Sequence, residues 1–364
     1  MIGKVKPAFT GDEKAILIVT DAYRPQVNGV VRSIEYMEEE LRGMGFRVEI
    51  LSPDRFRTMP CPGYAEIRLA LTRPATLRKH MIAAGCAHLH IATEGPLGLM
   101  AANIARRLSW PFTTAYHSRF PEYAAARVPL PAAFFYGWFR RFHNKGDGCM
   151  VVTETLKSDL ANHGFKRLMR WSRGVDTSLF RSTPETDLVN EVVADLPRPI
   201  FLYVGRVSVE KSIPDFLDLD LPGTKMVVGD GPELERLRRK YPGVQFTGAK
   251  TGTDLARHYA NADVFVFPSK TDTFGLVVLE ALACGLPIAA YPVMGPRDVL
   301  GEHATGPERI GVLSEDLRQA ALDALDIPSD RCRAFALGYG WNSSAQQFRD
   351  NVLSVRSSVT TDVP

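Results

Sequence analysis

The stretch that decides the fold is DVFVFPSKTDTFGLVVLEALACGLPIAAYP, residues 263–292. A short run of β-branched and aromatic residues at 263–269 is followed by a helix-length apolar segment and by a second apolar run at 287–292. A strand, a helix and a strand in this order predict two parallel strands that are buried on both faces. Two carboxylates interrupt the apolar pattern: Asp272 lies in the loop, and Glu280 lies within the helix.

The same alternation of strands and helices runs through most of the chain. Strand candidates lie at 15–20, 47–52, 87–92, 112–116 and 148–153, and again at 199–205, 225–230, 244–248, 263–269 and 287–292. Two such series predict an α/β protein with two Rossmann-like domains, each built on a parallel sheet. The strand signal disappears within 181–198, which is polar and contains prolines. We therefore expect domains at 1–185 and 186–340, followed by a C-terminal helix and tail at 341–364.

Composition sets broad limits on the class of protein. The chain has 364 residues, enough for two domains of ~150 residues each. A net charge of +3 is too small to indicate a nucleic-acid partner. The five cysteines are scattered, as is typical of a reducing compartment, and they show no metal-binding spacing. With no signal peptide and no run of ~18 apolar residues, we expect a cytoplasmic protein that can still touch a membrane surface.

The loop after the first predicted strand is TDAYRPQVNGVVRSIEYM, residues 20–37. Gly29 permits close approach of a ligand to the backbone, and a helix begins just after it. Free N–H groups at that helix start would favour an anion. An ordinary turn between a strand and a helix explains the same residues.

The loop YVGRVSVEKSIPDF, residues 203–216, follows another predicted strand. Arg206 and Lys211 could clamp a diphosphate there, Arg206 through its forked donors and Lys211 as a point charge. Two solvated basic residues, one of them paired with Glu210, are the alternative.

The carboxylates of the opening stretch also allow two interpretations. Glu280 is the one ionisable residue in FGLVVLEALACG, and a buried carboxylate needs a partner. A ribose diol can donate two hydroxyls to it, whereas a core arginine could pair with it instead. His117 follows a strand of the first domain and could face a ligand, although a lone histidine is more often structural. The segment VVGDGPEL at 227–234 lacks the third glycine of a dinucleotide fingerprint, so a nicotinamide cofactor is not expected.

Together these motifs resemble those of the retaining nucleotide-sugar glycosyltransferases with the GT-B fold, in which two Rossmann-like domains face a central cleft. The resemblance rests on Gly205-Arg206 with Lys211, on GDGPE at 229–233, and on the D-x7-E spacing from Asp272 to Glu280. The segments PQVNGVVRS and YHSRFPEY are similar to the branch that holds α-mannosyltransferases and sulfoquinovosyl or glucuronosyl diacylglycerol synthases. The resemblance covers essentially the whole chain.

The resemblance implies a donor-binding role for each matched residue. Gly29 would lie against the donor phosphates, and Glu280 would hold the nucleoside ribose. Arg206 and Lys211 would neutralise the leaving diphosphate, so that no metal ion or other cofactor is required. Backbone N–H groups would be presented to the sugar and phosphate by Phe274, Gly275 and Leu276.

Catalysis in this family is thought to retain the anomeric configuration without a protein nucleophile. The resemblance implies that His117, on the first, acceptor-binding domain, contacts the sugar and positions the reacting centre. Asp272 would lie near the sugar hydroxyls together with Arg206 and Lys211. Asp272 stands where the family usually has glutamate. The donor used by relatives that carry glutamate therefore cannot be assigned to this chain. The C-terminal helix would return to the first domain.

The segment PAAFFYGWFRRFHNKGDG, residues 131–148, bears on the acceptor. On a helix, one face would be formed by Phe135, Trp138, Phe139 and Phe142. Basic residues fall on the other faces, so the helix could lie at an anionic membrane interface or could be a core helix with a solvated basic side.

We therefore expect a metal-independent hexosyltransferase that works peripherally on the inner face of the cytoplasmic membrane. It would move a hexosyl or hexuronosyl group, with a UDP donor favoured, to a lipid acceptor such as diacylglycerol. The alternatives are a mannosyltransferase that uses GDP-mannose on phosphatidylinositol or a soluble glycan, a sugar-nucleotide epimerase, and a non-catalytic nucleotide-sugar binder. The base, the sugar and the oligomeric state are not fixed by the sequence.

Overall fold

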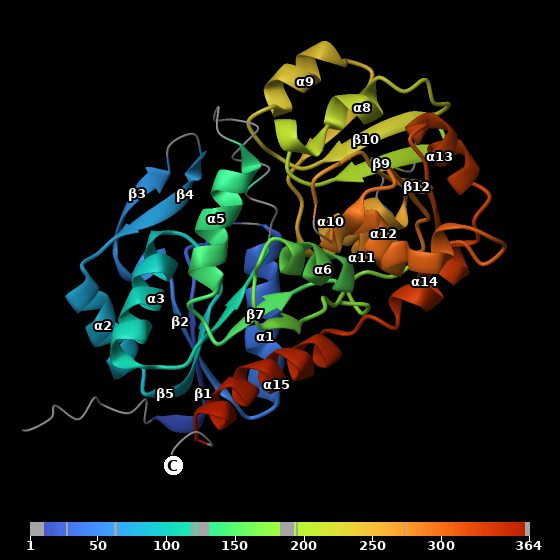
Figure 1. Ribbon diagram of the computed structural model, residues 1–364. Coiled ribbons are helices and arrows are strands. Elements are labelled where there is room, and N and C mark those ends of the chain that lie inside the picture. Colours follow the sequence, from blue (N-terminus) through green and yellow to red (C-terminus); the bar gives the residue numbers. More distant parts are fainter. Residues whose placement is uncertain are drawn as a thin grey trace, which may run out of the picture. The chain divides into compact units, whose positions relative to one another are not determined.

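The computed structural model describes residues 11–26, 28–61, 64–117, 121, 131–182, 193, 196–272 and 274–360. The chain forms two compact units. The first unit comprises Met1–Ser172 together with Trp341–Pro364, and the second comprises Arg173–Gly340. Figure 1 draws both, with the chain coloured from blue to red.

The first unit is built on a six-stranded parallel sheet in the order β2-β1-β5-β6-β7-β8. Its strands are β1 (Asp12–Val19), β2 (Arg47–Leu51), β5 (Cys86–Ile91), β6 (Thr113–Ala115), β7 (Gly148–Val151) and β8 (Leu168–Arg170). The chain leaves β1 toward β2 and then crosses to β5 on the other side of β1. The strand order therefore reverses between β1 and β5, which is where ligands bind in sheets of this kind.

Helices connect these strands and cover the sheet. They are α1 (Gly29–Gly43), α2 (Pro74–Ala83), α3 (Pro96–Leu108), α5 (Ala132–His143) and α6 (Glu154–Asn162). An antiparallel hairpin, β3 (Arg57–Cys61) with β4 (Tyr64–Leu71), forms a separate two-stranded sheet. The sequence did not predict this hairpin, because β3 has no buried residue and lacks the apolar run of a core strand.

The second unit repeats the design with the order β11-β10-β9-β12-β13-β14. Its strands are β9 (Ile200–Val204), β10 (Thr224–Val228), β11 (Gln245–Gly248), β12 (Val264–Phe267), β13 (Ile288–Ala290) and β14 (Gly311–Leu313). Its helices are η3 (Val209–Lys211), α8 (Ile213–Leu217), α9 (Leu234–Lys240), α10 (Gly252–Ala260), α11 (Leu276–Ala283), α12 (Met294–Leu300), η4 (Gly301–Ala304), α13 (Leu317–Ala324) and α14 (Ser329–Ala336). Here the order reverses between β9 and β12.

The last helix, α15 (Trp341–Thr360), belongs to the first unit. The ring of Trp341 stacks on Tyr36 of α1 at a centroid distance of 4.7 Å. Figure 1 shows α15, in red, beside the blue α1. The predicted fold class, two Rossmann-like α/β domains with a C-terminal helix that returns to the first, is confirmed.

The first unit ends earlier than the expected boundary between 185 and 186, a point that lies outside the described residues. The structural division follows Ser172, because the next residues pack within the second unit. Phe180 meets Tyr259 edge-on with ring centroids 5.7 Å apart. Its carbonyl also accepts a hydrogen bond of 3.1 Å from the Arg333 guanidinium. The sequence placed the boundary by loss of strand signal, which says nothing about these contacts.

Candidate active site

The centre of the candidate site is an ion pair at the point where the strand order of the second unit reverses. Lys211 follows β9 and Asp272 follows β12, and these two strands are neighbours in the sheet. The Nζ atom of Lys211 lies 2.5 Å from Oδ1 of Asp272, and their side chains are 20% and 17% exposed. This carboxylate comes from a different loop of the second unit than Lys211. Two predicted site residues are thereby brought together.

The second carboxylate oxygen of Asp272 is buried. No described residue gives Oδ2 a hydrogen bond. Buried carboxylate oxygens in native proteins have partners, so this oxygen is suited to a hydroxyl that a ligand brings. A sugar hydroxyl has that chemistry.

The glycines of the GDGPE segment allow the loops after β9 and β10 to pack closely. Gly229 has φ 153°, and a Cβ there would lie 1.8 Å from the carbonyl oxygen of Gly205. A Cβ on Gly231 would lie 2.3 Å from the carbonyl oxygen of Val207. The N–H of Val207 in turn donates to Asp230 O at 2.9 Å. The segment therefore shapes the edge of the site and is not a dinucleotide fingerprint.

A buried tyrosine supports the loop that carries Arg206. The hydroxyl of Tyr203 donates to the Arg206 carbonyl oxygen at 2.9 Å. Burial, followed by the negative charges of Asp272 and Glu210, holds the pKa of Tyr203 well above its usual value. The hydroxyl therefore stays protonated and donates this hydrogen bond, which fixes the backbone at Arg206. The Arg206 residue is half-buried.

Helix α11 begins beside Asp272. Phe274 is buried, and Gly275, with φ 85°, takes the N-cap position without a side chain that could accept from the first turn. An anion or sugar oxygen placed there would complete the cap of the turn that begins at Leu276. The backbone of Asp272 is fixed from α12, since a Cβ on Gly295 would lie 2.8 Å from its carbonyl oxygen.

Glu280 lies on α11 and is 5% exposed. Its Oε2 accepts a hydrogen bond of 2.9 Å from the hydroxyl of Tyr259, which belongs to α10. This contact explains how an apolar helix tolerates a carboxylate in the absence of a ligand. In this contact the partner is a neutral hydroxyl.

The remaining predicted residues, Gly29 and His117, belong to the first unit. Gly29 is exposed at the first position of α1. The Asn28 side chain accepts from the N–H groups of Val30 and Val31, both at 3.0 Å, so the expectation of free N–H groups there was wrong for these two. His117 lies two residues after β6 and meets Trp171 edge-on at 5.7 Å. Most of the adjoining YHSRFPEY segment lies outside the described residues.

Two acidic residues at the corresponding point of the first unit were missed. Asp21 follows β1 and accepts from the N–H groups of Leu97 and Gly98 at 2.8 and 3.1 Å. Burial raises the pKa of Asp21, although these hydrogen bonds oppose the shift. Glu94 follows β5 and its charge also raises that pKa. Their positions directly after predicted strands were the signal that could have identified them.

A buried histidine contacts the carboxylate of Glu94. His143 Nε2 lies 3.0 Å from Glu94 Oε1, and its Nδ1 lies 2.9 Å from the hydroxyl of Thr114. The His143 side chain is fully buried. Burial by itself lowers the pKa of His143, but Cys149 and Glu94 outweigh it and raise the pKa to about 10. The pair fixes a carboxylate at the carboxyl edge of the first sheet.

We expect Glu94→Gln to destabilise the protein in a pH-dependent way. The folded-state pKa of His143 is raised from 6.5 to about 10, so the stabilisation is fully present below the lower value and is lost as the pH rises through the higher one. At low pH the variant should lose about 3 kcal/mol of unfolding free energy, because the buried, protonated imidazole of His143 is left without its carboxylate partner. The loss should shrink toward high pH, where His143 is neutral. Urea denaturation across this range measures it. Glu308→Gln, at an exposed pair with Arg331, is the control, and an equal loss at both ends of the range would contradict the assignment.

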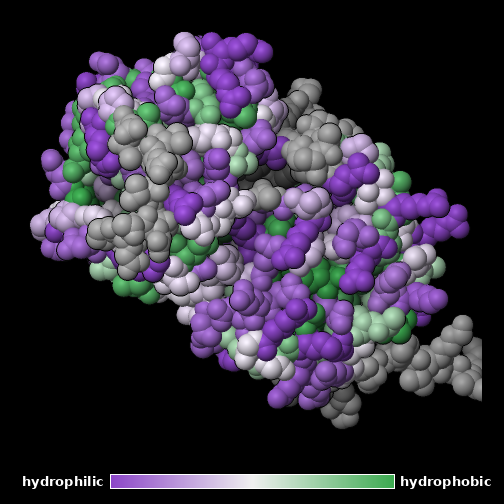
Figure 2. All heavy atoms as spheres, turned by 180° about the vertical axis from the view of Figure 1, so that it is seen from behind, coloured by the Kyte–Doolittle hydropathy of each residue, from purple (hydrophilic) through white to green (hydrophobic). Residues whose placement is uncertain are grey.

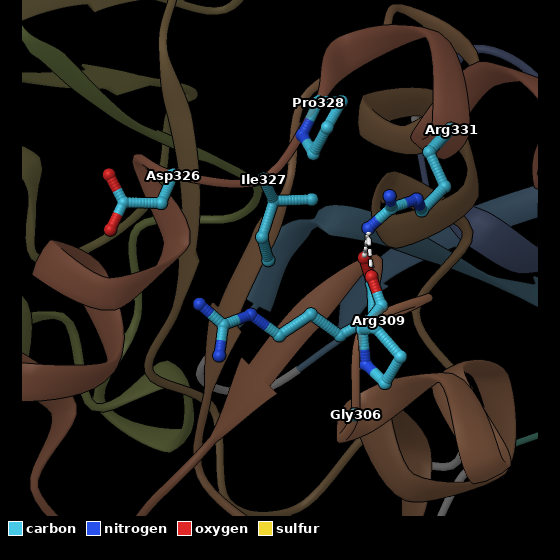
Figure 3. Close-up of a pocket in the computed structure, with 7 residues that line it drawn as sticks. Gly306, Arg309, Asp326, Ile327, Pro328 and Arg331 are labelled. Carbon is cyan, nitrogen blue, oxygen red and sulfur yellow. Dashed lines mark hydrogen bonds between the residues drawn. The ribbon is translucent and has the colours of Figure 1, made fainter.

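A hollow of about 410 Å³ lies elsewhere in the second unit. Figure 3 shows Arg309, Asp326 and Arg331 among its lining residues, which come from the segment before β14, from the α13–α14 connection and from α14 itself. In a parallel sheet that segment marks the amino edge, opposite the edge that carries Lys211 and Asp272. The hollow is therefore separate from the candidate site.

Comparison with known proteins matches both units to glycosyltransferases. The model of glycosyl transferases group 1 matches residues 198–326, and the model of Glycosyltransferase Family 4 matches residues 27–179. A GDP-mannose-dependent alpha-mannosyltransferase of Mycobacterium tuberculosis (strain CDC 1551 / Oshkosh) is 29% identical and spans 95% of this chain and 98% of its own. Sulfoquinovosyl transferase SQD2 of Arabidopsis thaliana is 29% identical over 77% of this chain and 60% of its own. Alpha-monoglucosyldiacylglycerol synthase of Streptococcus pneumoniae (strain ATCC BAA-255 / R6) is 26% identical over 86% and 78%.

Solved structures agree on the fold. WaaG, a glycosyltransferase involved in lipopolysaccharide biosynthesis, has a TM-score of 0.68 at 16% identity, over 92% of this chain and 99% of its own. Anabaena Alr3699/HepE in complex with UDP has a TM-score of 0.66 at 15% identity, over 93% and 100%.

Proposed function

This chain belongs to the GT-B glycosyltransferases and is a hexosyltransferase with a sugar-nucleotide donor, and we propose that it retains the anomeric configuration and delivers the sugar to a membrane lipid. The observation that carries the proposal is the ion pair between Lys211 and Asp272. It places a cation for a diphosphate and an unsatisfied carboxylate oxygen for a sugar hydroxyl at the same reversal of strand order.

The proposed reaction needs positioning and charge neutralisation more than covalent chemistry. The acceptor hydroxyl attacks the anomeric carbon on the face from which the nucleoside diphosphate leaves, and a leaving-group oxygen takes the proton. Lys211 and Arg206 stabilise the developing negative charge, which is the largest contribution to catalysis in sites of this type. We propose that Asp272 binds hydroxyls of the transferred sugar and that His117 also contacts the sugar. Because two cations are supplied by the protein, we propose that no divalent metal is needed.

Two donors are supported by different observations. The glycolipid resemblance favours UDP, and the synthase relative acts in glucosyl diacylglycerol formation by its name. The mannosyltransferase relative that spans nearly the whole chain names GDP-mannose. Calorimetric titration with GDP and with UDP decides between them, since the base adds affinity only where it fits. Tight binding of GDP supports a mannosyl donor, and tight binding of UDP supports the glucosyl or sulfoquinovosyl alternatives.

The lipid acceptor is supported by the surface of α5. Phe134 and Trp138 are 60% and 44% exposed, Arg141 continues the same helical face, and Lys145 lies in the turn just after the helix ends. This corrects the predicted apolar face: of its four residues Phe139 and Phe142 are buried, whereas Trp138 is largely exposed. The buried face of α5 starts from a different residue, because aromatic rings of neighbouring elements determine which side of the helix packs into the core.

The basic end of this face is crowded with cations. Burial, followed by the charges of Arg141 and Arg106, lowers the pKa of Lys145. An anionic surface would relieve this repulsion while the two exposed rings enter the interface. Figure 2, which views the molecule from behind, shows mainly hydrophilic side chains with hydrophobic ones in small groups. Among the described helices none is long and apolar enough to cross a bilayer, so we propose peripheral attachment, at the inner face of the cytoplasmic membrane.

We expect Phe134→Ser combined with Trp138→Ser to weaken binding to anionic vesicles by about tenfold or more, because each ring contributes ~1.5–3 kcal/mol when fully buried. Flotation with vesicles that contain an anionic phospholipid measures the bound fraction. Leu337→Ser, at a residue of the second unit that is 56% exposed, is the control. Equal binding of the double variant and the wild type would contradict the proposal that this surface of α5 binds the membrane.

A further inference from the structure

Trp171 lies directly after β8 and is 1% exposed. The His117 ring meets it edge-on, with centroids 5.7 Å apart and planes at 78°. An edge-to-face contact of this kind favours one orientation of both rings over others. Trp171 therefore restrains the ring of His117, which follows the short strand β6.

Helix α15 fixes Trp171 in turn. The indole Nε1–H donates to the hydroxyl of Ser344 at 3.1 Å, and that hydroxyl donates to Ser172 O at 2.8 Å. On its apolar side Trp171 packs against Phe348, with ring centroids 5.1 Å apart. Because both the polar and the apolar edges of the indole are held by one helix, its orientation depends on α15.

We propose that Trp171 is a positioning residue for His117 and that α15, through Ser344 and Phe348, sets this position. The inference rests on the proposed role of His117 at the transferred sugar. A displaced contact to the reacting centre lowers turnover far more than donor affinity, because affinity is shared among many other groups. The C-terminal helix would then act on catalysis in addition to stability.

The test compares two aromatic anchors of the same region. Trp171→Leu removes the ring that touches His117, whereas Trp341→Leu removes the α15 ring that stacks on Tyr36. We expect Trp171→Leu to lower kcat about tenfold or more, with KM for the donor changed less than about threefold. We expect Trp341→Leu to lower the melting temperature at least as much while it keeps kcat within about threefold.

Two readouts separate positioning from general loss of structure. In the NMR spectrum the His117 ring protons should shift in Trp171→Leu and stay unchanged in Trp341→Leu, because only the first removes the adjacent ring current. Trp171→Phe, which keeps an aromatic edge, should recover most of the lost kcat. Ser344→Ala, which removes only the hydrogen bond to the indole, should fold normally and lower kcat by about threefold.

The outcomes distinguish this inference from the proposed function. If His117→Ala lowers kcat but Trp171→Leu and Ser344→Ala leave it unchanged, the positioning role is overturned and the role of His117 stands. An equal kcat loss in Trp341→Leu would also overturn it, since the effect would then follow stability. Full activity of His117→Ala would overturn both. Loss of kcat with a shifted His117 resonance in the Trp171 variants alone supports the inference.

Discussion

Lys211→Met is expected to lower kcat for nucleoside diphosphate release by roughly 10²–10³-fold, because removal of one preorganised charge at a leaving group has an effect of that size. The side-chain length is nearly kept, so the change isolates the charge. Arg206→Ala should act in the same direction. Under the proposed role of Arg206 and Lys211 as the neutralising cations, activity should be unaffected by EDTA. Coupled detection of released nucleoside diphosphate measures each variant.

The control for this variant is Lys270→Met. Lys270 lies two residues from Asp272 but pairs with Asp215 at 2.6 Å, and its side chain is 50% exposed. It should keep kcat within about twofold, as expected for a surface ion pair outside the site. Turnover of Lys211→Met close to that of the wild type, or an EDTA-sensitive wild type, would contradict the role of Lys211.

Glu280→Gln is expected to weaken binding of the free nucleoside diphosphate by roughly 30–100-fold. The carboxylate can accept from both ribose hydroxyls, and each hydrogen bond to a charged group contributes about 1.5–3 kcal/mol. The amide oxygen can still accept from Tyr259, so the fold should remain intact. Calorimetric titration measures the affinity, and thermal unfolding checks the fold.

Tyr259→Phe separates the structural contact from the ligand contact. It removes the hydroxyl that bonds to Glu280 but leaves the carboxylate in place. We expect it to reduce stability by about 1–2 kcal/mol with nucleotide affinity little changed. If Glu280→Gln binds the nucleotide as tightly as the wild type, Glu280 has only the structural role.

The sequence predicts the βαβ unit at 263–292 because strands buried on both faces need continuous apolar runs. It also selects Lys211 and Asp272, since charged residues after buried strands point to the carboxyl edge. Their contact could not be predicted, because β9 and β12 are separated by two strands along the chain and are neighbours only in the sheet. Strand order follows from packing of the whole unit rather than from local pattern.

Other features were missed because they also depend on contacts between elements that are distant in the sequence. The helical period of α5 was evident, but which face is buried depends on the rings of other elements, such as Phe165 against Tyr116 and His143. Glu94 and His143 are far apart in sequence, and neither belongs to a motif. Their pairing required the positions of β5 and α5 in three dimensions.

The most direct test of the central claim is transfer itself. Purified protein is incubated with vesicles made from bacterial membrane lipid and with radiolabelled GDP-mannose or a panel of UDP-sugars, and the label is counted after extraction into organic solvent. The account predicts label in the organic phase with one donor class, and its loss in Lys211→Met. Absence of lipid-linked label with every donor, with nucleoside diphosphate released only when soluble sugars are added, would contradict the lipid acceptor.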